Sequence, residues 1–357
     1  MSLFLVTPND QKVYQEKIEP HLPQKMIDIH CHIWLDELRK QQPLSEGEVQ
    51  RKVTWPSLVA KDNSVEDLQE TYRLLFPGKE VTPLMFASAE RETLTACNAY
   101  VQDASARTGY PALYFSDPLE DADTLEKNIR EGGFVGVKSY LDFSPSYLPE
   151  AEIRIFDFFP KEQLKRLDRL GAIVMLHIPR HGRLKDPVNI AQIKEIKQSF
   201  PRIRLIIAHI GRAYTKGDVG QAFEELKACA ECSTLMFDFC ANTNDYAMTK
   251  LLEAYGPKHT LFGSDMPILR MRMRRIEENG TYINLIPPGL YGDPRQDSHL
   301  REVSPEEGEK LTFFMYEEIL AFQRAAKAVG LDAKDLEDVY YNNGLALING
   351  ARSDIYK

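Results

Sequence analysis

Short apolar runs, bounded by polar or turn residues, recur along the chain at a regular spacing. Eight of them have the length and composition of β-strands. They cover residues 25–30, 81–88, 111–116, 134–140, 172–178, 204–210, 235–240 and 260–265. Runs such as Ala172-Ile-Val-Met-Leu176 are apolar without alternation, which is typical of parallel strands covered on both faces by helices.

Segments with helical periodicity separate most of these strands. They lie at 64–76, 90–107, 121–131, 161–170, 188–199, 219–230 and 246–255, and two more, at 304–329 and 332–349, form a helical tail. The repeated strand–helix order predicts an α/β fold, a (β/α)8 TIM barrel in a single domain over residues 1–357. The competing doubly wound sheet requires a glycine-rich turn after its first strand, where this chain has His-Cys-His.

Two predicted connections are far longer than the usual connection of about 2–6 residues. One follows the first strand, at roughly 33–63, and the other follows the eighth, at roughly 267–303. Loops of this length in a barrel are usually functional, so we expect both to contribute to the active face.

Composition and charge narrow the classes of function. The 357 residues are 43% hydrophobic and carry a net charge of −9, which argues against nucleic acid or an anionic membrane as a partner. We expect a cytoplasmic protein, because no apolar run approaches the ~20 residues of a membrane span and the start of the chain lacks a signal pattern. The five cysteines are scattered, and Cys229-Ala-Glu-Cys232 lacks the second pair of a structural zinc site.

Two histidines stand at the end of the first predicted strand, in the segment Met26-Ile-Asp-Ile-His-Cys-His32. Because side chains alternate across a strand, His30 and His32 point the same way, into the barrel mouth, and Cys31 points to the other side. Two such imidazoles can chelate one ion, with Asp28 as a supporting acceptor. Alone, the spacing is equally compatible with two polar residues at a strand end.

Polar residues also end four other apolar strands. His177 follows Val-Met-Leu, His209 follows Ile-Ile-Ala, and Asp265 follows Leu-Phe-Gly-Ser. A barrel brings the carboxyl ends of its strands to one site, so these groups are expected to converge with the first two histidines as a metal site. Lys138 ends the fourth strand, either as a cation for Asp265 or an anionic substrate, or as a metal-bridging carbamate.

In combination, these motifs resemble the amidohydrolase superfamily. They are Asp28-Ile-His30-Cys-His32, His177, His209 and Gly263-Ser-Asp265-Met-Pro267, in an order that spans essentially the whole chain. Within the superfamily, the chain is most similar to the amidohydrolase-related branch that includes aminocarboxymuconate semialdehyde decarboxylase and several sugar-acid lactonases.

The resemblance implies one zinc ion, or manganese in its place, held by four ligands. These are His30, His32, His177 and Asp265. In dinuclear members a carbamylated lysine at the end of strand four bridges two metals, so Lys138 and His209 are candidates for a second site. We favour one ion, because members of the most similar branch usually lack this bridge. Asp265 would take the proton from metal-activated water, and His209 would stabilise the oxyanion or assist proton transfer.

Basic residues are frequent in the predicted loops after strands five, six and eight, on the same face of the barrel as the histidines. They are Arg180, His181, Arg183, Arg212, Lys216, Arg270, Arg272, Arg274 and Arg275. Since guanidinium groups bind carboxylates in bidentate geometry, we expect a small anionic substrate contacted by Arg212, Arg180 and Lys138. The cluster from Arg270 to Arg275 is equally compatible with a solvated helix or a subunit contact in a homo-oligomer.

Three functions fit these observations. The first is a metal-dependent hydrolase that cleaves a lactone, ester or amide bond of a small organic acid. The second is a metal-dependent non-oxidative decarboxylase or hydratase of an unsaturated carboxylic acid, acting at the same site. The third is a binding protein that has lost its chemistry, which is disfavoured because no predicted ligand and no proton shuttle is missing.

Overall fold

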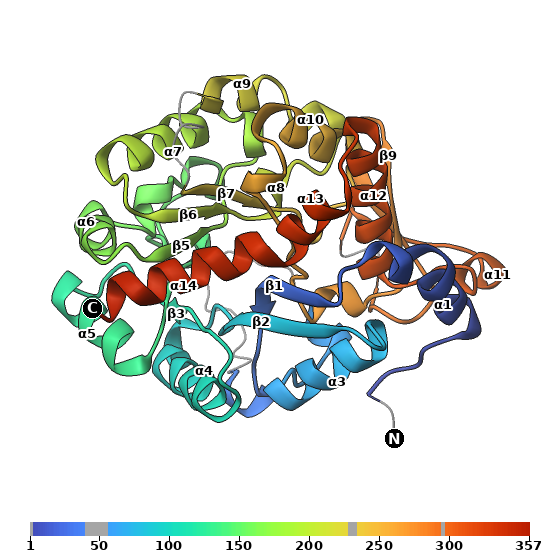
Figure 1. Cartoon of the computed structure of the whole chain (residues 1–357), viewed down its shortest axis with the longest axis horizontal. Helices are drawn as coiled ribbons and strands as arrows, with labels where there is room; N and C mark the ends of the chain where they lie inside the picture. The colour runs from blue at the N-terminus through green and yellow to red at the C-terminus, as the bar shows by residue number, and fades with distance from the viewer. Residues whose placement is uncertain (1–2, 40–55, 228–233, 294–296) are drawn as a thin grey trace.

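Eight parallel strands form the centre of the structure, a computed structural model that describes residues 3–39, 56–227, 234–293 and 297–357 (Figure 1). They are β1 (Lys25–His32), β2 (Glu80–Phe86), β3 (Tyr114–Phe115), β4 (Gly136–Lys138), β5 (Ile173–Leu176), β6 (Arg204–Ile207), β7 (Leu235–Asp238) and β8 (Thr260–Leu261). All eight predicted strands are confirmed. Most are shorter than predicted, because residues at their carboxyl ends leave the hydrogen-bonded ladder and enter the loops.

Backbone hydrogen bonds join the strands into a ring. Strands β3 to β8 form one parallel sheet in chain order, and β1 pairs with β2. Met85 N donates to Pro111 O over 3.0 Å, which links β2 to the segment before β3. Asp265 N donates to His30 O over 2.7 Å, which links the segment after β8 to β1. The predicted (β/α)8 barrel is thus the observed fold, with β1 and the end of β8 side by side.

Helices surround this ring (Figure 1). The predicted helices correspond to α3 (Val65–Leu75), α4 (Leu94–Thr108), α5 (Ala122–Gly132), α6 (Lys161–Leu170), α7 (Pro187–Ser199), α9 (Ala222–Leu226) and α10 (Asp245–Tyr255). Helix α6 illustrates their packing: Leu164, Leu167 and Leu170 recur at three-residue spacing and are buried, while charged residues occupy the other face. Among the described residues the structure adds three short helices, α1 (Pro8–Val13), α2 (Pro56–Val59) and α8 (His209–Arg212).

The long segment after β8 contains a small sheet that the sequence analysis did not predict. Its strands are β9 (Arg274–Glu278), β10 (Thr281–Ile286) and β11 (Leu300–Glu302), in the order β11-β10-β9. The β9–β10 hairpin turns at Asn279 and Gly280, whose φ angles of 52° and 75° suit a tight two-residue turn. The interpretation of Arg270 to Arg275 as a solvated helix is therefore wrong. The Asn-Gly pair is typical of a hairpin turn, and the sequence analysis overlooked it.

The helical tail is confirmed, with one correction. It consists of α11 (Pro305–Gly308), α12 (Phe314–Val329), α13 (Ala333–Glu337) and α14 (Asn343–Ile355). The single helix predicted over 304–329 is broken before α12, because Thr312 O and Phe314 N instead bond to Met273 N and Met271 O. Helix α14 crosses the amino ends of the strands, where Asp354 pairs with Arg204 at 2.9 Å. The carboxyl ends of the strands, on the opposite side of the barrel, carry the candidate functional site.

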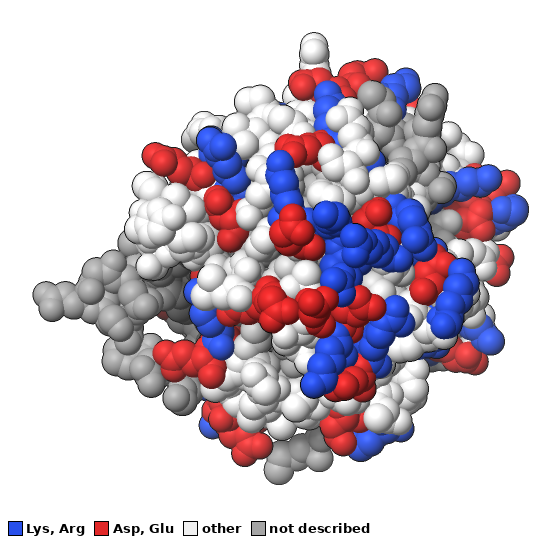
Figure 2. Space-filling view, turned by 90° about the vertical axis from the view of Figure 1, so that its left-hand side faces the viewer, with Lys and Arg blue, Asp and Glu red and all other residues white. Residues whose placement is uncertain are grey.

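The charges on one face of the molecule are largely compensated. Figure 2 views the side on which α5 and α6 lie and shows acidic and basic side chains interspersed. Arg166 of α6, for example, pairs with Asp123 and Glu126 of α5, in both cases at 2.6 Å. Among the described helices, none has the length and apolar character needed to traverse a bilayer.

Candidate metal centre

Three of the predicted metal ligands converge at the carboxyl ends of β1 and β8. Asp265 Oδ1 lies 3.6 Å from His30 Nε2 and 3.5 Å from His32 Nε2. One ligand atom from each residue falls within 4.8 Å of the others. The closure of the barrel causes this convergence, because it puts the residue after β8 beside the last residues of β1.

In three of the site histidines, the Nδ1 atom faces a hydrogen-bond acceptor. His30 Nδ1 lies 3.0 Å from Asp238 Oδ2, His32 Nδ1 lies 3.1 Å from Ala87 O, and His209 Nδ1 lies 3.0 Å from Cys240 O. In a neutral ring, a nitrogen that faces such an acceptor carries the proton. Each Nε2 then keeps its lone pair, so these rings are arranged as metal ligands or proton acceptors.

A strained backbone segment carries His209. The short element α8 (His209–Arg212) has left-handed φ angles of 58°, 51°, 59° and 60°. For a non-glycine residue such a conformation costs about 1 kcal/mol or more, so the surroundings must fix it. Asp238 Oδ1 accepts from His209 N at 2.7 Å, and Asn242 Nδ2 donates to His209 O at 3.1 Å. The last residue of β7 and the loop after it therefore hold this histidine in place.

His177 lies in the same site but outside the closest ligand group. Its ring centroid is 4.6 Å from that of Tyr140 and 5.2 Å from that of His209. Its buried Nδ1 has no hydrogen-bond partner in the described part of the chain. Burial, followed by the charge of Arg212, lowers the pKa of His177 well below its ordinary value, so the ring is neutral. Three histidines, one of which has an unpartnered nitrogen, and one carboxylate are donors that fit a zinc or manganese ion.

Lys138 is buried at the end of β4, as predicted, and its Nζ lies 5.6 Å from the centre of the Phe86 ring. No ion pair within 4.0 Å involves it among the described residues. Burial lowers the pKa of Lys138 to about 8, although the charge of Asp265 opposes this shift. A neutral amine is the form that can become a carbamate. The predicted contact with Asp265 is not observed within 4.0 Å in the described part of the chain and Lys138 is not among the cavity residues, so its role toward a substrate or a metal stays a prediction.

The ionisation states suit proton transfer at Asp265. Burial raises the pKa of this carboxyl. In the acidic range where a carboxyl titrates the neighbouring imidazoles are protonated, and there the hydrogen bond from His32 and the charge of His209 outweigh burial and hold the pKa of Asp265 well below its ordinary value. Burial lowers the pKa of His209 to about 4. At neutral pH the site therefore combines an ionised Asp265 with a neutral His209.

A cavity of about 740 Å³ opens above these residues. His177, His209, Asp265 and Arg212 line it, together with Arg275 from β9. Aromatic residues form much of the remaining wall, namely Tyr140, Tyr214, Tyr282, Tyr291 and Phe314. The rim also carries the carboxylates of Glu150, Asp293 and Asp297. The small sheet after β8 therefore forms one side of the cavity.

Two guanidinium groups in this cavity have no carboxylate partner within 4.0 Å among the described residues. Arg212 donates to Pro179 O at 3.0 Å, and Arg275 donates to Asn284 Oδ1 at 2.8 Å and to Ala241 O at 2.7 Å. The Arg275 guanidinium also lies 4.8 and 4.7 Å from the ring centres of Tyr214 and Tyr282. Both groups are positioned to receive an anion.

Other predicted arginines are engaged elsewhere. Arg180 pairs with Asp186 at 3.0 Å and is not among the cavity residues, so its predicted role in substrate binding stays a prediction. Arg183 pairs with Asp218 at 2.6 Å, and Arg272 pairs with Asp10 at 2.5 Å. These pairs neutralise their charges within the protein. The Cys229 and Cys232 pair lies outside the described residues.

The sequence analysis missed Asp238 and Cys240. Asp238 ends the apolar strand β7, so the rule that found the other strand-end residues would have found it too. The support for the His30 ring was assigned to Asp28, and that assignment is wrong. Asp28 instead accepts from Ser264 N at 2.8 Å and from Tyr72 Oη at 2.7 Å, because it lies one step deeper, where it braces β1.

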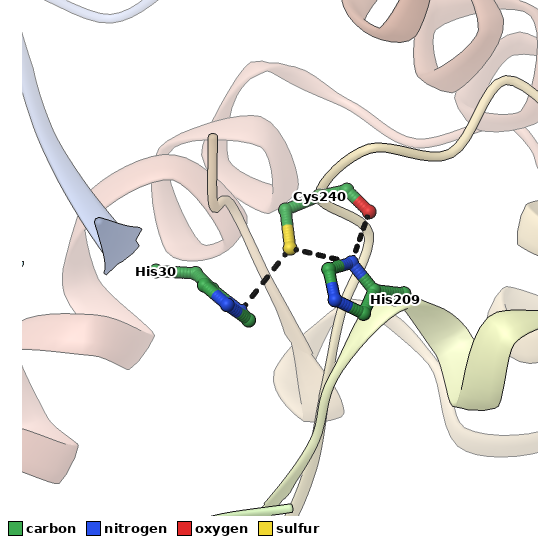
Figure 3. A group of neighbouring side chains, drawn as sticks. All are labelled: His30, His209 and Cys240. Atoms are coloured by element: carbon green, nitrogen blue, oxygen red, sulfur yellow. Dashed lines mark hydrogen bonds between the residues drawn. The ribbon is translucent and has the colours of Figure 1, made fainter. Parts of the chain in front are cut away.

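His30, His209 and Cys240 form a second compact group (Figure 3). Its ligand atoms also lie within 4.8 Å of one another. However, His30 Nδ1 already faces Asp238 and His209 Nδ1 already faces Cys240 O. This group is therefore better described as a hydrogen-bonded support behind the site than as a second metal site.

Comparison with known proteins agrees with this geometry. The family model described as Amidohydrolase matches residues 27–279. No curated protein matches the chain significantly. An amidohydrolase from Burkholderia multivorans with bound HEPES superposes with a TM-score of 0.57 and 12% identity, covering 91% of this chain and 99% of that one. A second crystal form of that protein contains zinc, with a TM-score of 0.55, 13% identity and coverage of 91% and 99%.

Two further solved structures share the fold. The 4-oxalomesaconate hydratase from Rhodopseudomonas palustris has a TM-score of 0.54 and 17% identity, covering 92% of this chain and 96% of that one. A dihydroxybenzoic acid decarboxylase from Polaromonas sp. JS666, with bound manganese and the inhibitor 2-nitroresorcinol, has a TM-score of 0.53 and 14% identity, with coverage of 92% and 97%. At such low sequence identities, the similarity to these structures shows a shared fold alone.

Proposed function

This chain belongs to the amidohydrolase family and is an enzyme of that superfamily, and from this premise we propose that it is a metal-dependent hydrolase of a lactone, ester or amide. The observation that carries the proposal is the convergence of His30, His32 and Asp265 beside a cavity lined by cationic groups. The substrate we propose is a small acid with at least one carboxylate.

The residues that would hold the metal are His30, His32, His177 and Asp265. We propose zinc or manganese, and one ion in preference to two. When bound, such an ion would lower the pKa of a coordinated water molecule to near 7. The chain supports this role by fixing the rings: Asp238 and Ala87 O hold the Nδ1 atoms of His30 and His32.

Asp265 is the group that moves the proton. Its carboxylate is ionised, so it can accept a proton from the attacking water as the new carbon–oxygen bond forms. It then returns this proton to the leaving oxygen or nitrogen as the scissile bond breaks. His209, neutral and fixed through its Nδ1, borders the reacting atoms and presents Nε2 to them.

Arg212 and Arg275 would bind the substrate carboxylate. Because neither guanidinium has a carboxylate partner in the described part of the protein, a substrate anion would supply the missing counter-charge. The tyrosines around Arg275 hold its planar group in one orientation, which reduces the entropy lost when an anion binds. We keep Lys138 as a third cation facing the substrate or the metal.

A substrate panel read by mass spectrometry tests the reaction. Lactones, esters, amides and unsaturated acids, each with a free carboxylate, are incubated with zinc- or manganese-loaded enzyme. Hydrolysis adds one water to the substrate and breaks a bond, whereas decarboxylation releases carbon dioxide. If carbon dioxide is released, the decarboxylase alternative would take the place of the proposed hydrolase. Addition of water without cleavage would indicate a hydratase, and both activities occur among the structures that share this fold.

Replacing Arg275 by glutamine should raise KM for the substrate found in this panel by about 10- to 100-fold, the loss expected for a hydrogen bond to a charged group. The change in kcat should be smaller, because Arg275 is assigned to the carboxylate and not to the reacting bond. Steady-state kinetics measure both parameters.

The matched control is Arg274→Gln on the same strand. Arg274 is about half exposed and faces Glu317 at 3.7 Å, and alternation along β9 turns it to the opposite face. This variant should keep the wild-type KM. If the two substitutions change KM equally, Arg275 does not bind the substrate.

A further inference from the structure

The loop after β7 places a buried thiol between two histidines (Figure 3). Cys240 Sγ lies 3.2 Å from His30 Nδ1, 3.1 Å from His209 Nδ1 and 3.0 Å from Asp238 Oδ1. Cys240 and Asp238 are fully buried, and the two histidines are nearly so. A thiol in such a position either only fills space in the core or forms hydrogen bonds with all three groups.

The donors and acceptors of this group can all be matched. Asp238 is ionised and only accepts, so the thiol hydrogen points to Asp238 Oδ1. Burial raises the pKa of Cys240 well above its ordinary value, which keeps this hydrogen on sulfur. The sulfur lone pairs then face two N–H groups. The His30 N–H is shared between Asp238 Oδ2 and Sγ, and the His209 N–H between Cys240 O and Sγ.

We propose that Cys240 is a positioning residue, whose thiol holds the rings of His30 and His209 in the tautomer and orientation that present Nε2 of His30 to Asp265 and Nε2 of His209 to the cavity. While the thiol hydrogen points to Asp238, the sulfur can only accept a hydrogen bond. In the opposite tautomer, an Nδ1 without hydrogen would therefore face the sulfur with no hydrogen between the two atoms. One residue thus aligns a ligand on β1 with a histidine that follows β6. The inference rests on the proposed function where it treats His30 as a metal ligand.

A comparison of serine with alanine separates a polar role from packing. Cys240→Ser and Cys240→Ala remove nearly the same volume, but only serine keeps a donor and an acceptor at this position. If the thiol acts through its polar contacts, serine should resemble the wild type and alanine should not. If it only fills space, the two variants should be equally affected.

The first measurement is the tautomer of each ring in metal-free protein. Long-range ¹H–¹⁵N spectra of histidine-labelled protein distinguish the two neutral tautomers, and His30→Gln and His209→Gln variants assign the signals. Wild type and Cys240→Ser should show Nδ1–H at both rings, and Cys240→Ala should show a mixture at one ring or both. A wild-type ring protonated on Nε2 would overturn the proposal without any variant.

The second measurement is zinc affinity, determined by competition with a chromogenic chelator and without substrate. Cys240→Ala should bind zinc about 10- to 100-fold more weakly, as is typical when a partner of a metal ligand is removed. Cys240→Ser should stay close to wild type. If Cys240→Ala does not fold, Cys240→Val takes its place as the apolar variant.

Cys97→Ala is the control for loss of a buried thiol. Cys97 lies on α4, where its Sγ contacts Leu38 O at 3.7 Å, and its removal should change neither tautomers nor zinc affinity. Equal zinc affinity in the serine, alanine and wild-type proteins, with unchanged tautomers, contradicts the proposal. Correct tautomers in a protein that binds no zinc would instead count against the proposed function.

Discussion

Asp265→Asn is expected to lower kcat by about a thousandfold, within the range of roughly 10² to 10⁴ typical for loss of general acid–base catalysis. Asparagine keeps the size of the side chain and one oxygen that can face the metal. It cannot accept the proton of the attacking water, and Asp265 is the carboxylate that lies within 3.6 Å of both His30 and His32. Turnover of the substrate found in the panel measures the effect.

Metal content separates the loss of chemistry from the loss of the ion. Asp265→Asn should retain zinc at least in part, because three histidines remain, and metal analysis of the purified variant shows this directly. Asp103→Asn, on the exposed surface of α4, should keep wild-type activity. Substantial turnover by Asp265→Asn would assign the proton transfer to another group, with His209 as the next candidate.

Removal of the metal is expected to abolish turnover. The described site offers neutral imidazoles and a weakly basic carboxylate, and none of these groups by itself makes water a strong nucleophile at neutral pH. Dialysis against a chelator, followed by metal analysis and an activity assay, measures the loss. Adding back zinc or manganese should restore activity at about one equivalent per chain if a single ion suffices.

Treatment with chelator that is already saturated with metal is the control, because it exposes the protein to the same compound without removing the ion. Recovery that requires two equivalents would favour the second site at Lys138 and His209. Turnover that persists in metal-free protein would refute the metal-dependent function, whatever the product.

The barrel and most of the centre could be predicted because both depend on local pattern. Apolar runs at regular spacing identify buried strands, and a polar residue at the end of such a run faces the site, since parallel strands share one direction. This reasoning placed His30, His32 and Asp265 together and located Lys138 at the end of β4. It would also have found Asp238, whose strand-end position was overlooked.

Other features depend on contacts between distant segments. Arg275 lines the cavity because the Asn279-Gly280 hairpin folds β9 back over the barrel, and Arg180 turns to Asp186 instead of the site. Nothing in the sequence distinguishes these two arginines, since each follows a barrel strand. Of the tyrosines that hold Arg275, Tyr214 follows α8 and Tyr282 lies on β10, so their meeting has no local signal.

The sequence by itself determined the alternation of strands and helices and the residues that stand at the strand ends, because hydrophobic periodicity and side-chain alternation are local properties. Only the tertiary structure decided how those residues are held. Barrel closure brought Asp265 to β1, and the end of β7 and the loop after it supplied Asp238 and Cys240 to fix two histidine rings. Ring orientation depends on hydrogen bonds across the fold, and these form only once the strands are in register.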